Sequence, residues 1–491
     1  MKILYIDIDS LRPDHLGCYG YHRNTSPHID ALASEGVRFD NVYISDAPCL
    51  PSRTALFSGR CGFHTGVIDH GGRASTPIID DNRGFRDPFS LTSWPSLLQQ
   101  QGYYTTSISA FGQRHSAWHW YAGFHEVHAH IKNGNETADE VTPVALEWLD
   151  KHGQEDDWFL HFNIWDPHTP YRTPAEFGNP FENDPLPAHI TEEYWQAAWN
   201  GYGPHSPQEV NSFSDKAPHL HWWDGPNQLD SMEAVRWWID HYDTGIRWAD
   251  HHVGMLIAKL ETMGILDDTL IMISADHGEN QGELNVWGDH QTADEITCHI
   301  PLIVHGPQVK APRVDSALHY HYDWAATVLE LAGSPVPANW DGIPFTTAFI
   351  AGEELGQEFL VVSQGAWSCQ RGVRFNHDSV PYILLRTYHD GYKMLDDLML
   401  FNLADDPHEQ HNLATTQPEI VNCGLVYLVR WLTDMKATAT TDVDPMMTVL
   451  RQGGAFHTRG HLPAYLKRLR ATGRSQHADY LEEKHPAEAQ G

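Results

Sequence analysis

A cysteine at position 49 stands in a sequence that could place a nucleophile at the start of a helix. The segment reads Cys49-Leu50-Pro51-Ser52-Arg53 and continues to Ser58-Gly59-Arg60. Pro51 suits the first turn of a helix, because its missing N–H would have no partner there. Cys49 would then lie where free backbone N–H groups stabilise negative charge, with Arg53 one turn further on. An isolated cysteine is more often a small buried residue, so the flanking residues carry the functional interpretation.

Two apolar segments of the chain end in acidic side chains. Asp7 and Asp9 are two residues apart on a segment close to the N-terminus, so both would face the same side of a strand. Asp276 and His277 follow a second apolar segment and precede Gly278, which permits a tight turn. Carboxylates at two strand ends make an oxygen-rich site for a hard divalent cation such as Ca²⁺ or Mg²⁺. A lone aspartate there would more often cap a helix, but two such ends together with the cysteine motif predict a metal site.

These residues belong to a longer pattern that resembles the type I sulfatases, the formylglycine-dependent family of the alkaline phosphatase superfamily. Its signature is Cys49-x-Pro51-Ser52-Arg53, a helical stretch and Ser58-Gly59-Arg60. Five further blocks follow the order of the family, so the resemblance covers nearly the whole chain. They are residues 4–20 (LYIDIDSLRPDHLGCYG), 159–171 with Asp166-Pro167-His168-x-Pro170-Tyr171, 242–280 with SADHGE, 323–345, and 400–414 (LFNLADDPHEQHNLA).

The resemblance implies a specific chemistry at residue 49. In type I sulfatases a maturation enzyme oxidises this cysteine to formylglycine, whose hydrated aldehyde carries two hydroxyls. One hydroxyl attacks sulfur and expels the alcohol, and the other lets the sulfated intermediate collapse to the aldehyde and release sulfate. By the same resemblance Cys49, as formylglycine, joins the metal ligands. Arg53 orients it and offsets sulfate charge through paired donors.

The predicted metal site departs from the commonest pattern of the family. Asp9 is followed by Ser10 rather than by a second aspartate, and Asp276 is followed by His277 rather than by asparagine. The resulting set resembles a variant shared by sulfatases and by the related phosphonate and phosphodiester hydrolases. Asp7 is the candidate for the missing carboxylate. A histidine ligand keeps Ca²⁺ as the first expectation and adds Mn²⁺ to Mg²⁺ as an alternative.

Histidines correspond to further residues of the family's site. The family's Gly-Lys-Trp-His block is absent, and the matching region offers Arg114 or His115 as a positive or proton-transfer group. A family lysine, eleven residues before a Val-Pro-Leu-Ile strand, corresponds here to His290. His168 and His290 would then bind sulfate oxygens and protonate the leaving oxygen, and His115 would be the base for the collapse step. His64 is another candidate to line the site, although most of the 34 histidines are ordinary surface or core residues.

Short apolar segments alternate with amphipathic stretches over much of the chain. This alternation predicts an α/β fold with helices on both faces of a sheet, and ligands bind beyond the carboxyl ends of the strands in such sheets. The resemblance implies a large mixed sheet of the alkaline phosphatase type. Strands are expected at residues 3–8, 103–110, 158–165, 270–274 and 301–305, and helices at 27–33, 138–151, 232–263 and 323–331.

The change of pattern near residue 355 divides the chain into two expected domains. Residues 1–355 form the catalytic domain, with an insertion near the site at 175–230, where Pro, Asn, His and Trp are frequent and periodicity is lost. Residues 356–491 form a smaller α+β domain, whose tail either folds back or stays mobile. The elements expected in this second domain are two strands and one helix, at 359–363, 382–386 and 418–436.

Composition excludes several partners. The 491 residues carry a formal charge of −33, which repels nucleic-acid phosphates and anionic membranes. No stretch of the chain is apolar and long enough to span a membrane. The N-terminal apolar run is too short for a signal peptide, so we expect a cytoplasmic protein, or a periplasmic or secreted one if a leader precedes this sequence. The oligomeric state is open.

The expected substrate is a sulfate ester, free or on an oligosaccharide. The frequent tryptophans favour a carbohydrate sulfate, because sugars stack on aromatic faces. Tryptophans occur in and after the insertion, and at least one of the adjacent pair is expected to pack inward: Trp195, Trp199, Trp222, Trp223, Trp237 and Trp238. Two alternatives stay open. One is a phosphonate monoester or phosphodiester hydrolase of the same superfamily, and the other is a non-catalytic protein that binds sulfated glycans through an unmodified Cys49.

Overall fold

The largest sheet of the computed structural model has a buried parallel core. The structure describes residues 1–78, 88–129, 132–214 and 225–490. At the centre, β1 (Lys2–Ile8) pairs in parallel with β6 (Trp158–Ile164) on one side and with β7 (Thr269–Ser274) on the other. These three strands are almost entirely buried, as expected for near-continuous apolar segments covered on both faces.

Within the described residues this sheet is mixed and has nine strands, in the order β11-β2-β10-β7-β1-β6-β4-β5 with β12 beside β2. It is mixed because β10 runs antiparallel to both β7 and β2, whereas the other pairs are parallel. The other strands are β2 (Val37–Tyr43), β4 (Tyr104–Ile108), β5 (Glu126–His128), β10 (His299–His305), β11 (Arg313–Asp315) and β12 (His319–Tyr320).

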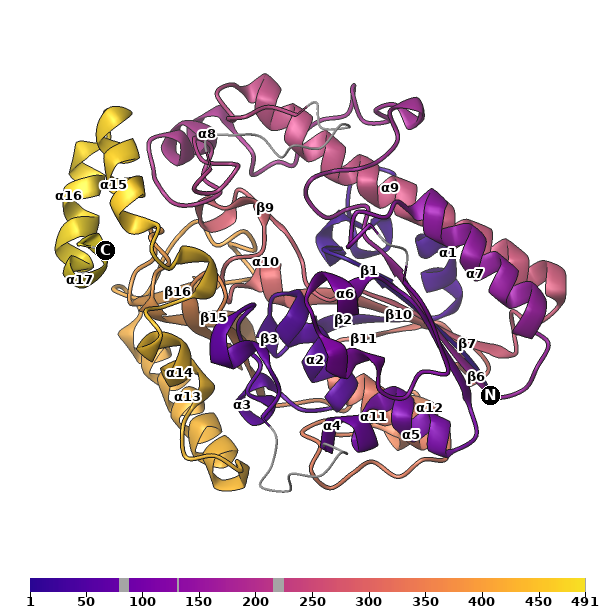
Figure 1. The fold of residues 1–491 in the computed structure, drawn as a ribbon. Helices are drawn as coiled ribbons and strands as arrows, with labels where there is room; N and C mark the ends of the chain where they lie inside the picture. Colours follow the sequence, from indigo (N-terminus) through magenta and orange to yellow (C-terminus); the bar gives the residue numbers. More distant parts are fainter. Residues whose placement is uncertain (79–87, 130–131, 215–224, 491) are drawn as a thin grey trace.

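Helices cover both faces of this sheet (Figure 1). One layer contains α1 (Pro27–Glu35), α7 (Ala138–His152) and the long α9 (Met232–Met263). The opposite layer contains α2 (Cys49–Ser58), α5 (Trp94–Gln100), α11 (His321–Leu331) and α12 (Thr346–Ala351). The predicted α/β fold with a large mixed sheet between helices is therefore confirmed.

The sequence sets the ends of α9 through local chemistry. The Ser231 hydroxyl accepts a hydrogen bond from the Ala234 N–H, which satisfies one of the free donors of the first turn. Gly264 ends the helix at a φ of 69°, a left-handed conformation that glycine adopts without steric cost. These two signals explain why the observed bounds equal the predicted 232–263.

In the part of the chain that the structure describes, a second sheet has five strands in the order β16-β15-β14-β13-β3. All but β3 follow residue 355, and α13 packs on them (Figure 1). The strand β3 is a two-residue segment from the N-terminal part of the chain. Its Asp46 pairs with Ser363 in parallel. The segment directly before Cys49 therefore belongs to the second sheet, although it comes from the N-terminal part of the chain. The elements are β3 (Asp46–Ala47), β13 (Phe359–Gln364), β14 (Cys369–His377), β15 (Val380–His389), β16 (Leu398–Asn402) and α13 (Pro418–Thr438).

The chain after residue 441 folds back as helices rather than staying extended. Its last helices pack on one another and on Tyr202 and Tyr392. These helices are α15 (Leu462–Ala471), α16 (Ser475–Lys484) and α17 (Pro486–Ala489), whereas the preceding α14 (Pro445–Arg451) packs on β14. The division into domains at residue 355 stays a prediction.

Short elements complete the described part of the chain. The described residues of the predicted insertion include the two-turn α-helix α8, and the loops near the site carry the short hairpin β8–β9. The short elements are α3 (Gly62–Thr65), α4 (Pro88–Thr92), α6 (Phe111–Arg114), α8 (Glu192–Trp199), β8 (Asn280–Gln281), β9 (Trp287–Asp289) and α10 (Glu295–Cys298).

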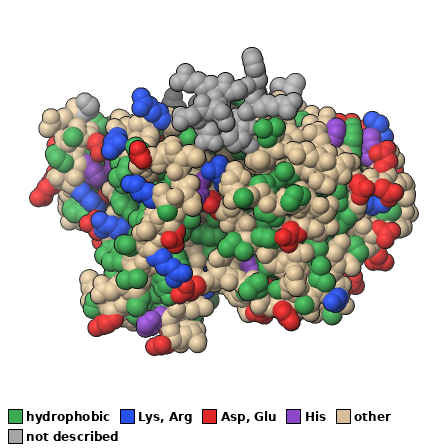
Figure 2. All heavy atoms as spheres, turned by 90° about the horizontal axis from the view of Figure 1, so that it is seen from below, with side chains coloured by type: hydrophobic (Ala, Val, Ile, Leu, Met, Phe, Trp, Pro, Cys, Tyr) green, Lys and Arg blue, Asp and Glu red, His purple; other side chains and the backbone are tan. Residues whose placement is uncertain are grey.

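Acidic side chains are spread over the face shown in Figure 2 rather than gathered into one patch. This distribution agrees with a high negative charge carried by the surface as a whole. Within the described residues, no helix combines the length and apolarity needed to cross a membrane.

Candidate active site

Three carboxylates from two strand ends converge on one buried guanidinium. Arg53 donates from Nε to Asp7 Oδ2 at 3.0 Å, and from Nη1 to Asp9 Oδ2 at 3.0 Å and to Asp276 Oδ2 at 2.5 Å. All four side chains are at most 2 % exposed. The parallel pairing of β1 with β7 explains the meeting, because it brings both carboxyl ends to the same edge of the sheet.

Cys49 lies at the same edge. It is the first residue of α2 rather than the residue before it, with Pro48 as the N-cap, a shift of one position from the prediction. The Ser52 hydroxyl donates to the Asp276 carbonyl at 2.6 Å, which anchors the first turn of α2 to the end of β7. The Sγ atom of Cys49 is 3.3 Å from Nε2 of His277. Candidate ligand atoms of Cys49, Asp276 and His277 all lie within 4.8 Å of one another.

Two of the predicted histidines join Cys49. Ligand atoms of Cys49, His168 and His290 lie within 4.8 Å of one another. The His290 ring stacks on that of His277 with centroids 3.8 Å apart, and His168 Nε2 is 4.0 Å from Asp9 Oδ1. The structure therefore brings the carboxylates, the cysteine and three imidazoles into one cluster.

The carboxylates of this cluster are not equivalent. Burial raises the pKa of Asp9, but Arg53 and the imidazoles of His168 and His277 outweigh it and hold that pKa far below its usual range. Burial together with repulsion from the neighbouring aspartates raises the pKa of Asp276. The cause is a shortage of positive charge, since one guanidinium faces three carboxylates. Such a site favours an added cation.

The three imidazoles of the cluster are neutral near pH 7. Burial lowers the pKa of His168 and of His290 to about 3 and that of His277 to about 4. A neutral imidazole has a free lone pair on one ring nitrogen, which can bind a metal or accept a proton.

The structure does not place His115 and His64 in the Cys49 cluster. His115 lies beside Phe111 and His70, with ring centroids 5.1 and 4.9 Å away, and its buried Nε2 has no hydrogen-bond partner in the described part of the chain. His64 is turned away, because its Nδ1 is 2.8 Å from both Asp341 oxygens and its Nε2 is 3.0 Å from the Met435 carbonyl. Its contacts are those of a structural residue that joins α3 to α13.

Sequence reasoning missed residues that hold or extend the cluster. His161, in the middle of β6, bonds Asp7 Oδ2 through Nε2 at 3.1 Å and Ser107 through Nδ1 at 3.0 Å. The available signal was a histidine inside an otherwise apolar, buried strand. His70 bonds His457 at 3.0 Å, a contact between the N-terminal part of the chain and its tail that no local pattern reveals.

Comparison with known proteins agrees with this geometry. The family model described as Sulfatase matches residues 2–334. The chain is 22% identical to an N-acetylglucosamine-6-O-sulfatase of Bacteroides thetaiotaomicron, over 84% of this chain and 82% of that protein. It is 26% identical to a choline-sulfatase of Rhizobium meliloti, over 93% of each. A solved structure of an enzyme in complex with its substrate D-glucosamine-2-N,6-O-disulfate superposes with a TM-score of 0.67 and 21% identity, over 91% of this chain and 99% of that one.

The family match spans more than half of the chain and includes β1, α2 and β7, the elements that form the Cys49 cluster. The solved structure adds the same fold over nearly the full length. The chain belongs to the sulfatase family, whose members are sulfuric ester hydrolases.

Proposed function

We propose that this sulfatase hydrolyses the sulfate ester of a carbohydrate, with a formylglycine made from Cys49 and a divalent cation bound beside it. The observation that carries the proposal is the meeting of Cys49 with two acidic strand ends in one buried cluster. A non-catalytic thiol would not require three carboxylates and three imidazoles around it.

The donor set fits a divalent cation. Asp9, Asp276 and His277 would hold it together with residue 49, and Asp7 would complete the set. Asp7 Oδ1 is buried and has no hydrogen-bond partner among the described residues, so a lone pair is free for such a ligand. Oxygen donors favour Ca²⁺, with Mg²⁺ and Mn²⁺ as alternatives because one donor is an imidazole. When bound, the cation polarises the sulfate oxygens and lowers the pKa of the attacking group.

Residue 49 opens a buried helix, and this position suits the proposed nucleophile. Formylglycine supplies a hydrated aldehyde, one hydroxyl of which can attack sulfur while the other allows release of sulfate. Residue 49 is the first residue of α2, and the positive end of the helix dipole favours negative charge there. Arg53 holds the surrounding carboxylates in place and offsets part of the negative charge that sulfate brings.

We assign proton transfer to the imidazole side chains of His168, His290 and His115. Ligand atoms of His168 and His290 lie within 4.8 Å of the Cys49 sulfur, so we assign these residues to sulfate binding and to protonation of the leaving oxygen. The negative charge of a bound sulfate would favour the protonated imidazole that this second role needs. His115 lies outside this group but has a buried, unpartnered Nε2 atom within the described residues, and we keep it as the base for the collapse step.

The substrate class rests on two relatives. One is named for sulfate on carbon 6 of N-acetylglucosamine, and the solved neighbour holds a disulfated glucosamine. Trp195 and Trp199 of α8 are partly exposed, with ring centroids 6.2 Å apart, and could offer an aromatic face to a sugar. Trp238 is 1 % exposed and belongs to the core, in agreement with the expectation that at least one of the adjacent Trp237 and Trp238 packs inward. Trp222 and Trp223 lie outside the described residues.

Two measurements test the proposal. Mass spectrometry of the Cys49 peptide should show the exchange of sulfur for oxygen with loss of two hydrogens. Hydrolysis should then be measured, as sulfate release from N-sulfated and O-sulfated glucosamines and from choline sulfate, and as alcohol release from a phosphonate monoester. We expect the highest kcat/KM on a sulfated sugar. A clear preference for choline sulfate or for the phosphonate would overturn the substrate assignment.

A further inference from the structure

A second histidine–carboxylate cluster lies apart from the Cys49 site, where three distant segments meet. His189 comes from the predicted insertion, Glu283 from the loop after β8, and His408 from the loop after β16. His408 Nδ1 is 3.1 Å and His189 Nε2 is 3.6 Å from the same Glu283 oxygen, Oε1. The two imidazole rings stack with centroids 3.4 Å apart and an interplanar angle of 18°.

Glu283 is held rigidly for this role. Its side chain is fully buried and accepts hydrogen bonds from Arg12 on both oxygens, at 2.9 and 3.3 Å, and from the Gln281 N–H at 2.7 Å. Each carboxylate oxygen has two lone pairs, so Oε1 can bind a second partner beside Arg12. Asp14 also pairs with Arg12, which leaves the group with an excess of negative charge.

Besides its stacking on His408, the His189 ring contacts Tyr194, with ring centroids 6.3 Å apart. The His189 side chain is only 10 % exposed, and its Nε2 atom has no hydrogen-bond partner among the residues that the structure describes. Buried ring nitrogens are normally paired, so an unpaired one aimed at a carboxylate points to a missing ligand.

We propose that His189, Glu283 and His408 bind a transition-metal cation of the Zn²⁺ type. Their ligand atoms lie within 4.8 Å of one another, and two imidazoles with one carboxylate are a ligand set that suits zinc and leaves a position for water. The site differs in chemistry from the Cys49 cluster, where oxygen donors dominate. It does not depend on the proposed reaction.

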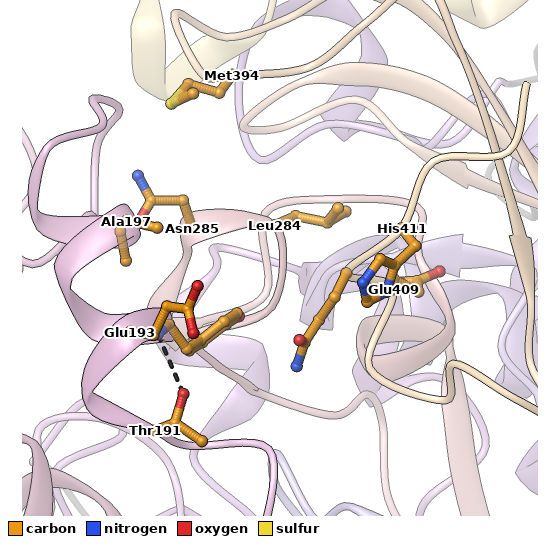
Figure 3. Close-up of a pocket in the computed structure, with 12 residues that line it drawn as sticks. Thr191, Glu193, Ala197, Leu284, Asn285, Met394, Glu409 and His411 are labelled. Atoms are coloured by element: carbon orange, nitrogen blue, oxygen red, sulfur yellow. Dashed lines mark hydrogen bonds between the residues drawn. The ribbon is translucent and has the colours of Figure 1, made fainter. Parts of the chain in front are cut away.

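The consequence of the bound cation would be mechanical. The three ligand-bearing segments also line a cavity of about 510 Å³, in which Thr191 and Glu193 of α8 lie opposite Glu409 and His411, with Leu284 between them (Figure 3). A cation bound by all three segments would hold the insertion against the second sheet and fix the width of this cavity. Without the cation, this cluster links Glu283 to the loop after β16 through one hydrogen bond, which His408 donates.

Metal counting tests the proposal. The metal-free enzyme is dialysed against Zn²⁺ in the presence of excess Ca²⁺, and zinc per chain is measured for the wild type and for the double variant His189→Gln/His408→Gln. Arg12 and Glu283 remain intact in this variant, so the fold should be kept. The matched control is His411→Gln, three residues from His408 but 78 % exposed and outside the cluster.

We expect the double variant to bind one zinc fewer than the wild type, and the control to bind the same number. Any zinc at the Cys49 site is common to all three proteins and cancels in the difference. The thermal unfolding midpoint should also rise with Zn²⁺ in the wild type and the control, and rise less in the double variant. Equal zinc content in all three proteins would overturn the proposal, whatever their sulfatase activity.

Discussion

The Nε2 atom of His277 lies 3.3 Å from the Sγ atom of Cys49, which joins the end of a strand to the start of a helix 228 residues away in sequence. This proximity is what the proposed function requires, because it assigns His277 to the metal and residue 49 to the attack on sulfur. The contact depends on the anchoring of α2 to the end of β7 through Ser52. Because every partner is buried, small changes here should have large and distinguishable effects.

Replacing Cys49 should abolish turnover without unfolding the enzyme. Cys49→Ala removes the precursor of the nucleophile, and Cys49→Ser leaves a single hydroxyl that cannot release sulfate by elimination. We expect no sulfate release above background from either variant, with unfolding midpoints close to the wild type. The matched control is Cys423→Ala, a partly exposed cysteine on α13. Wild-type rates from Cys49→Ser would contradict the formylglycine assignment.

Removing the charge of Arg53 should destabilise the protein most when no cation is present. Arg53→Met leaves three buried carboxylates without their shared partner, which should cost about 3–5 kcal/mol of unfolding free energy. A bound divalent cation supplies the missing charge, so Ca²⁺ should restore part of the loss. Denaturant titrations with and without Ca²⁺ check this, with the exposed Arg451→Met as control. A loss independent of Ca²⁺ would argue against a cation beside Arg53.

His161 should act on the metal through Asp7. His161→Leu removes the hydrogen bond that orients this carboxylate, and loss of such a supporting contact typically weakens metal binding about 10–100-fold. His161→Gln keeps a donor and should retain more affinity. The activity of each variant as a function of free Ca²⁺ gives the affinity directly. His125→Leu, which alters a contact with Thr105 instead, is the control. An unchanged Ca²⁺ dependence would remove Asp7 from the ligand set.

His290 should show the behaviour of a proton donor to the leaving group. His290→Ala should lower kcat about 10²–10⁴-fold on alkyl sulfates, whose alcohols leave poorly without a proton. Aryl sulfates have better leaving groups and should be affected much less. His290→Lys should recover part of the loss, because the resemblance places a lysine at this position. Equal losses on both substrate types would indicate sulfate binding without proton transfer.

Lys393 should make the protein more stable at alkaline pH. The side chain is 2 % exposed, and burial lowers its pKa from 10.5 to about 7. The unfolded chain therefore binds more protons than the folded one between about pH 7 and 10.5, and stability rises with pH through this window.

Lys393→Met should remove that dependence. We expect a gain of more than about 1 kcal/mol at pH 7 and a much smaller gain at pH 10. Unfolding by denaturant at both pH values measures the difference, with the exposed Lys467→Met as control. The same gain at both pH values would mean that the effect comes from packing rather than from charge.

Local patterns were sufficient for many elements of the fold. The bounds of α9 were predictable because Ser231 and Gly264 fix both of its ends. The central strands were predictable because burial on both faces demands continuous apolar residues. The strand β2 was missed, since polar residues interrupt its sequence VRFDNVY. The two-residue β3 was missed as well, because its only structural signal is a partner more than 300 residues away.

The residues of the candidate site likewise divide into those that local sequence patterns predict and those that depend on distant segments. Asp9, Asp276 and Cys49 stand in strong local motifs at the ends of regular elements, and the structure brings them together. His64 has a similar sequence context but is captured by Asp341 and α13, which no local pattern reveals. His457 approaches from the tail to contact His70 and Trp367. Contacts of this kind depend on the packing of distant segments and not on neighbouring residues.

The strand β3 can pair with β13 only late in the synthesis of the chain. Asp46 and Ala47 cannot find their partners Ser363 and Gln364 until about 300 further residues have been translated. At typical synthesis rates of about 5–20 residues per second, this delay is roughly 15–60 s. During that interval the segment before Cys49 lacks its neighbouring strand. If Cys49 is converted as proposed, the late arrival of the second sheet leaves this interval for a maturation enzyme to reach a side chain that is 2 % exposed in the finished protein.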